Sequence, residues 1–111
     1  MATPLQTLKA DLFRALAHPV RIRILERLRT GERTVQELQE VLGLEQPIVS
    51  QHLAALRARD LVVVRRERTQ AYYALRGPLV ADLLRVAREF LNLRLSGSQS
   101  MLRELRREGR R

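Results

Sequence analysis

The sequence predicts a mainly α-helical domain with one small β-hairpin, and three observations lead to this fold class. Apolar residues recur at helical spacing over most of the 111 residues. A helix-capping motif at Thr34 and a glycine at position 43 enclose one short helix. Two apolar segments with β-branched or aromatic residues flank a polar stretch between residues 61 and 75. The length suits a single domain.

The first helix is predicted from Pro4 to Ala17, because leucines recur there at helical spacing. His18 precedes Pro19 and is therefore expected to be extended, with the proline at the first position of a second helix. The second helix should bury Val20, Ile24, Leu25 and Leu28.

The third helix is predicted to begin after Thr34, whose hydroxyl and the Glu37 carboxylate can cap each other's backbone N–H groups. Gly43 should end it, since glycine enters the left-handed conformation without penalty. A fourth helix is predicted from Gln46 to Arg59. Two short helices joined by a glycine-containing turn are typical of the DNA-binding helix-turn-helix.

A two-stranded ribbon is predicted next, with strands at Leu61–Arg65 and Ala71–Leu75. Gly77 and Pro78 then begin a long helix that continues to Leu95, which completes a domain over residues 1–95. A break is expected at Ser96–Ser98. Residues 96–111 form a basic tail in which Met101–Arg111 can make a short helix.

The fourth helix carries the predicted DNA-reading face. Val49, Leu53 and Leu56 share one side and should face the core, so the other side is left for a ligand. Amide and hydroxyl groups can read base edges, and arginine can reach phosphate or guanine. An ordinary solvated helix face is the alternative. The predicted DNA contacts on this helix are Gln46, Pro47, Ser50, Gln51, His52 and Arg57.

The hairpin tip is the second predicted DNA contact. Arg65, Arg66 and Arg68 lie so close in sequence that they repel one another unless an anion is near. A solvated turn is the alternative. The tip residues expected to touch the flanking minor groove or the backbone are Arg66, Arg68, Thr69 and Gln70.

The first and last long helices carry more apolar surface than a small core requires. They either cover the core or form a homodimer interface, and we expect a dimer because helix-turn-helix proteins are commonly two-fold symmetric. The predicted interface residues are Leu5, Leu8, Leu12, Leu83, Ala87, Phe90 and Leu91.

Composition limits the other possibilities. A net charge of +9 favours double-stranded DNA as the partner, with an anionic membrane surface as the second choice. The chain has no cysteine, and His18 and His52 lack further ligands at suitable spacing, so no metal site or cofactor is expected. No catalytic residues stand out. Without a signal peptide or an apolar membrane-spanning run, a cytoplasmic protein is expected.

Three separated motifs resemble the ArsR/SmtB family of winged helix-turn-helix repressors: Phe13–Leu25, Val49–Leu56 followed by Leu61–Val62, and Gln70–Leu75. The likeness covers Leu8 to Leu95. It implies a homodimeric transcriptional repressor that binds an inverted-repeat operator. In such a protein the first and last long helices form the dimer, and the helix from Gln46 to Arg59 reads the major groove. Many members release DNA when a metal binds.

The chain departs from the family pattern. The third helix, Val35–Val41, lacks the cysteines of metal-sensing members, and the last long helix has Asp82 and Glu89 but no histidine. Glu45 stands where a serine cap is common, and Arg68 where the wing turn commonly has glycine. The sequence therefore favours a repressor that is not a metal sensor. The alternatives are a low-specificity nucleoid-associated protein and a membrane-binding protein.

Overall fold

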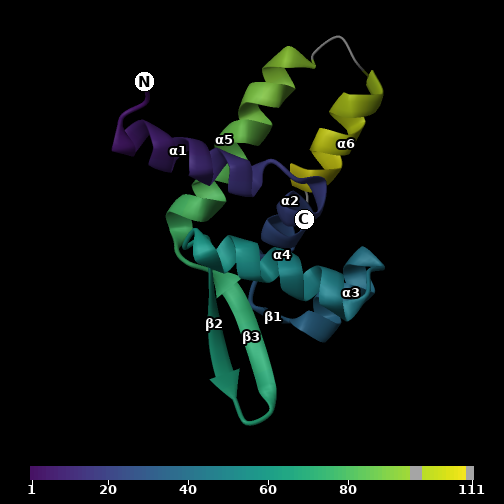
Figure 1. Cartoon of the computed structure of the whole chain (residues 1–111). Coiled ribbons are helices and arrows are strands. Elements are labelled where there is room, and N and C mark those ends of the chain that lie inside the picture. The colour runs from purple at the N-terminus through teal and green to yellow at the C-terminus, as the bar shows by residue number, and fades with distance from the viewer. Residues whose placement is uncertain (96–98, 110–111) are drawn as a thin grey trace.

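The computed structural model describes residues 1–95 and 99–109 (Figure 1). The predicted break at Ser96–Ser98 and the last two residues lie outside this range. The helices are α1 (Pro4–Leu16), α2 (Pro19–Leu28), α3 (Val35–Leu42), α4 (Gln46–Ala58), α5 (Pro78–Arg94) and α6 (Gln99–Gly109). The strands are β1 (Arg33–Thr34), β2 (Val62–Glu67) and β3 (Gln70–Leu75). The mainly helical fold with a hairpin wing is confirmed.

The ends of α3 follow the predicted chemistry. The backbone N–H of Glu37 donates to the Thr34 hydroxyl at 3.1 Å, and the Thr34 N–H donates to the Glu37 carboxylate at 2.9 Å. Gly43 ends the helix with φ of +67°. These two caps define the ends of the first helix of the helix-turn-helix, and only the three residues 43–45 separate it from α4.

The sheet differs from the predicted two-stranded ribbon, because β1 adds a third antiparallel strand in the order β1-β3-β2. Arg33 pairs with Tyr73 and Thr34 pairs with Tyr72, which joins the start of α3 to the wing. The hairpin strands are longer than predicted and leave Arg68 and Thr69 as the turn. Arg68 adopts φ of +56°, a left-handed conformation that is uncommon outside glycine.

The core lies among α2, α3, α4 and the base of the sheet. Val49, Leu53 and Leu56 are fully buried, as predicted, so α4 has a fixed inner face. The wing projects beyond the α3–α4 layer, whereas α1, α5 and α6 lie toward the other end of the molecule (Figure 1). In the tail, α6 begins at Gln99, two residues before the predicted start, and is described to Gly109. Among the described residues, no helix combines the length and apolar character that crossing a membrane requires.

Candidate nucleic-acid interface

The outer face of α4, opposite the buried side, carries polar or small side chains. Pro47, Gln51 and Ala54 are exposed on this side. Arg57 is exposed toward the end of the helix, where it can reach a polyanion beside the face. The α4 face, defined by these four residues, presents one amide, one cation and otherwise small groups. Such a surface can enter a major groove without steric hindrance.

Gln46 and Ser50 extend this face on one flank. The Gln46 Nε2 group donates to the Ser50 hydroxyl at 2.7 Å, and Ser50 is half-buried while Gln46 is exposed. The two side chains therefore hold each other across one helical turn. Glu45, which precedes them, makes no side-chain cap at the helix start.

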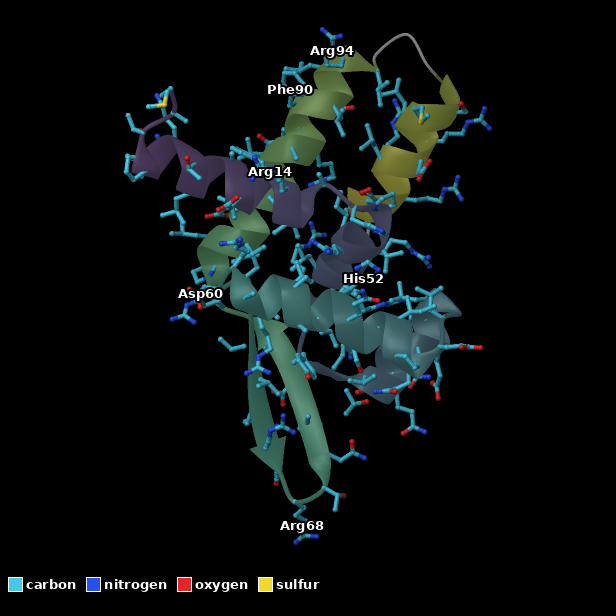
Figure 2. All side chains as sticks on the ribbon, in the orientation of Figure 1. Arg14, His52, Asp60, Arg68, Phe90 and Arg94 are labelled. Atoms are coloured by element: carbon cyan, nitrogen blue, oxygen red, sulfur yellow. The ribbon has the colours of Figure 1, made fainter. Side chains whose placement is uncertain are left out.

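His52 lies on the opposite flank, against α2 (Figure 2). Its Nδ1 atom accepts from the Arg21 Nε group at 3.2 Å, and its ring centroid is 4.4 Å from that of His18. Burial, with the positive charges of His18 and Arg21, lowers the pKa of His52. His18 in turn caps α2, because its Nδ1 atom accepts from the Val20 N–H at 3.1 Å. The structure thus separates His52 from the other predicted contacts of α4.

The wing divides its arginines between two roles. Arg65 pairs with Glu32 at 2.7 Å and with Glu67 at 2.6 Å, and its guanidinium lies 4.5 Å from the Tyr72 ring centroid. These two carboxylates therefore reduce the expected repulsion between Arg65 and the neighbouring arginines. The spacing of the arginines in the sequence did not reveal the two ion pairs. Arg66 and Arg68 are exposed and form no ion pair within the part of the chain that the structure describes. Arg66 and Arg68 are therefore the wing cations that are available to bind an external anion.

The wing turn and α4 meet along one groove. Gln46 from α4, Thr69 from the turn and Gln70 from the start of β3 line it together. Arg68 lies at the far tip of the wing, and Phe90 lies near the opposite end of the molecule (Figure 2). The predicted DNA contacts other than His52 thus belong to two neighbouring elements, α4 and the wing.

The second site is an apolar stripe along α5. Its five large side chains are spaced alternately four and three residues apart, and all are exposed in the single chain: Leu79, Leu83, Val86, Phe90 and Leu93. Exposure reaches 76% at Leu79 and 78% at Leu93, so a single chain leaves the stripe uncovered. The predicted interface residues include Leu83 and Phe90 of this stripe but not the other three. Their heptad spacing was the signal that could have identified them.

The other predicted interface residues are divided between surface and core. Leu5 and Leu8 of α1 and Leu91 of α5 are exposed. Ala87 is also exposed. Leu12 is half-buried and packs against the core, so α1 has one apolar side in the core and one in solvent.

The titratable side chains of the described residues do not form a metal site. Within residues 1–95 and 99–109, no three His, Cys, Asp or Glu side chains form a cluster suited to a metal ion. The Nδ1 atoms of both histidines are occupied by hydrogen bonds inside the protein.

Comparison with known proteins gives the family. Residues 18–63 match the family described as "Bacterial regulatory protein, arsR family". The HTH-type transcriptional regulator Rv0081 of Mycobacterium tuberculosis is 44% identical over 107 residues, which cover 96% of this chain and 94% of that protein. A probable mercury resistance operon repressor of Streptomyces lividans is 43% identical, over 71% of this chain and 63% of its own length.

Solved structures agree with this relationship. The crystal structure of Rv0081 superimposes with a TM-score of 0.82, covering 86% of this chain and 97% of that one. The homodimeric winged helix-turn-helix DNA-binding domain Mb0332 of Mycobacterium bovis, solved by NMR, gives a TM-score of 0.75 at 33% identity, over 83% and 91% of the two chains. The motifs, the fold and these relatives together show that the chain belongs to the ArsR family of bacterial regulatory proteins.

Proposed function

We propose that the protein is a dimeric transcriptional repressor that binds an inverted-repeat DNA operator in the cytoplasm. Family membership makes it a regulator and not an enzyme. The observation that carries the proposal is the α4 face, whose inner side is fixed by fully buried Val49, Leu53 and Leu56. A helix held this rigidly can present Gln51 to base edges while Arg57 contacts a phosphate.

Dimerisation is the second part of the proposal, and it is supported by the α5 stripe. Pairing two copies along Leu79, Leu83, Val86, Phe90 and Leu93 would bury apolar surface that one chain leaves in water. The NMR relative Mb0332 is described as homodimeric. A two-fold axis near the end that bears Phe90 would leave both α4 faces free for two half-sites, about 10 base pairs apart from centre to centre.

A low-specificity DNA coat is the second candidate, and the net charge of +9 favours it over a membrane partner. Selection of bound fragments from the source genome separates the two. Enrichment of a few sites that share an inverted repeat supports the repressor. Fragments recovered without a common sequence would support the coat.

We also propose that soft metals do not control DNA binding by this protein. Zinc, cadmium and arsenite require thiolate or imidazole ligands in sets of about three or four, whereas this chain has no cysteine and only His18 and His52. Neither metals nor arsenite should change operator affinity at near-stoichiometric concentration. Titration of each into the operator complex, followed by anisotropy, tests this. Release by micromolar zinc that a chelator reverses would contradict it and indicate an intersubunit site.

A further inference from the structure

A groove of about 350 Å³ lies between α3, the first turn of α4 and the wing turn, and its lining is unusually uniform. Four of its seven lining residues are glutamines: Gln36 and Gln39 from α3, Gln46 from α4 and Gln70 from β3. We call it the amide groove. Its remaining polar residue is Thr69, and no charged side chain lines it among the described residues. The groove therefore offers hydrogen-bond donors and acceptors without net charge.

Hydrogen bonds within the described protein explain the position of only one of these four glutamine side chains. The Gln46 amide bonds to Ser50, and Gln6, elsewhere in the chain, caps α1. In contrast, the side chains of Gln36, Gln39 and Gln70 make no hydrogen bond to any residue within 1–95 and 99–109. Gln36 and Gln70 are exposed and Gln39 is half-buried, so all three can meet a partner.

The position of the amide groove identifies that partner. A helix in the major groove of B-DNA and a ribbon over the adjacent minor groove are separated by one sugar–phosphate strand. The first turn of α4 and the wing turn both line the amide groove, through Gln46 and Thr69. We propose, resting on the function proposed above, that the amide groove holds that DNA strand, with Gln36 and Gln39 of α3 contacting its phosphate oxygens.

The lining chemistry fits a sugar–phosphate strand. Amide N–H groups donate to phosphate oxygens, and glutamine is among the side chains that commonly make such contacts. The small apolar groups of Val35 and Ala71, which complete the lining, suit the carbon face of deoxyribose. Neutral donors add affinity without replacing condensed counterions. Their contribution is therefore nearly independent of salt, unlike that of Arg68.

The test compares the double variant Gln36→Ala/Gln39→Ala with the wild-type protein on a selected operator and on a random duplex of equal length. Two lost neutral hydrogen bonds should weaken binding about tenfold on both DNAs. The slope of log affinity against log salt should stay the same. Arg68→Ala, in contrast, should lower that slope by about 1. Fluorescence anisotropy over a range of salt concentrations gives both quantities.

Controls make each outcome decisive. Alanine is a better helix former than glutamine, so the variant should keep its thermal unfolding midpoint. Asn92→Ala removes an exposed amide from α5, far from the wing turn, and should leave DNA affinity unchanged. Unchanged affinity of the double variant would overturn the inference, and so would a loss confined to the operator, which would mean base reading. A wild-type protein that binds neither DNA would instead overturn the proposed function.

Discussion

At the scale of single residues, α4 shows that adjacent positions serve different purposes. Gln51 is exposed on the α4 face, whereas His52 turns back to Arg21 and His18. The Arg21 guanidinium also donates to the Ala15 carbonyl at 3.4 Å, so one polar cluster joins α1, α2 and α4. We infer that His52 positions the reading helix and does not itself touch DNA.

The His52 cluster predicts a pH dependence of stability. The pKa of His52 is lowered in the folded protein, so the fold favours the neutral ring. The neutral His52 ring stabilises the fold at pH values above its pKa in the unfolded chain, about 6.5. This stabilisation is lost as the pH falls below that value, because a protonated Nδ1 cannot accept a hydrogen bond from Arg21. His52→Gln keeps an acceptor without a titrating group. Its free energy of unfolding in urea should fall less between neutral and mildly acidic pH than that of the wild-type protein.

If the two proteins lose the same stability over this interval, His52 has no part in the acid sensitivity. Sequence reasoning excluded both histidines as metal ligands and placed His52 among the DNA contacts. It could not identify a structural role for His52, because the position of this residue beside the buried face of the helix does not reveal its partners. Only the packing of α2 against α4 brings Arg21 to its Nδ1 atom.

At the scale of elements, the described tail forms a helix that contacts the domain. α6 packs on α5, and its Glu108 shares a cavity of about 260 Å³ with Glu26 of α2. Burial, followed by the hydrogen bond and the charge of Glu108, raises the pKa of Glu26 to about 7. Glu104 acts in the same direction and Arg29 opposes it. Arg23 and Arg27 of α2 also line the cavity, whereas α3 contributes only the apolar Val41 and Leu42.

The docking of α6 should therefore weaken as pH rises from about 4.5 to about 7. Below this interval the Glu26 carboxyl is protonated in the docked and the undocked chain alike, and within it the undocked chain loses this proton first, which favours undocking. Hydrogen-exchange protection factors of the α6 amides should fall over this range. Glu26→Gln should remove most of the change. Glu40→Gln, on the exposed side of α3, should retain it, and equal behaviour of the two variants would refute the role of Glu26.

Helices and strands could be predicted where the residues that determine them lie close together in the sequence. The Thr34 and Glu37 capping box and Gly43 located α3 because each acts within a few residues. β1 was missed, since two residues carry no periodicity and become a strand only by pairing with Tyr72 and Tyr73. The same limit hid the amide groove, whose lining comes from three elements that only the tertiary fold brings together.

At the scale of the whole molecule, Arg68 at the wing tip and Phe90 of the α5 stripe lie at opposite ends (Figure 2). Phe90→Glu should dissociate the dimer, because the carboxylate would be buried twice about the two-fold axis. Phe90 is 61% exposed in the single chain, so the variant should still fold. Light scattering together with circular dichroism measures both properties. Asn92→Glu, off the stripe, is the matched control and should stay dimeric; a folded, dimeric Phe90 variant would relocate the interface.

The ratio of affinities for a selected operator and a random duplex, at one fixed salt concentration, separates a specific repressor from a general DNA coat. A sequence-specific dimer should bind the operator about a thousandfold more tightly, or better. Gln51→Ala should reduce that ratio by roughly tenfold through loss of a base contact while leaving random-duplex affinity unchanged. A wild-type ratio near one, with steep salt dependence on both DNAs, would contradict the account and identify a general DNA coat.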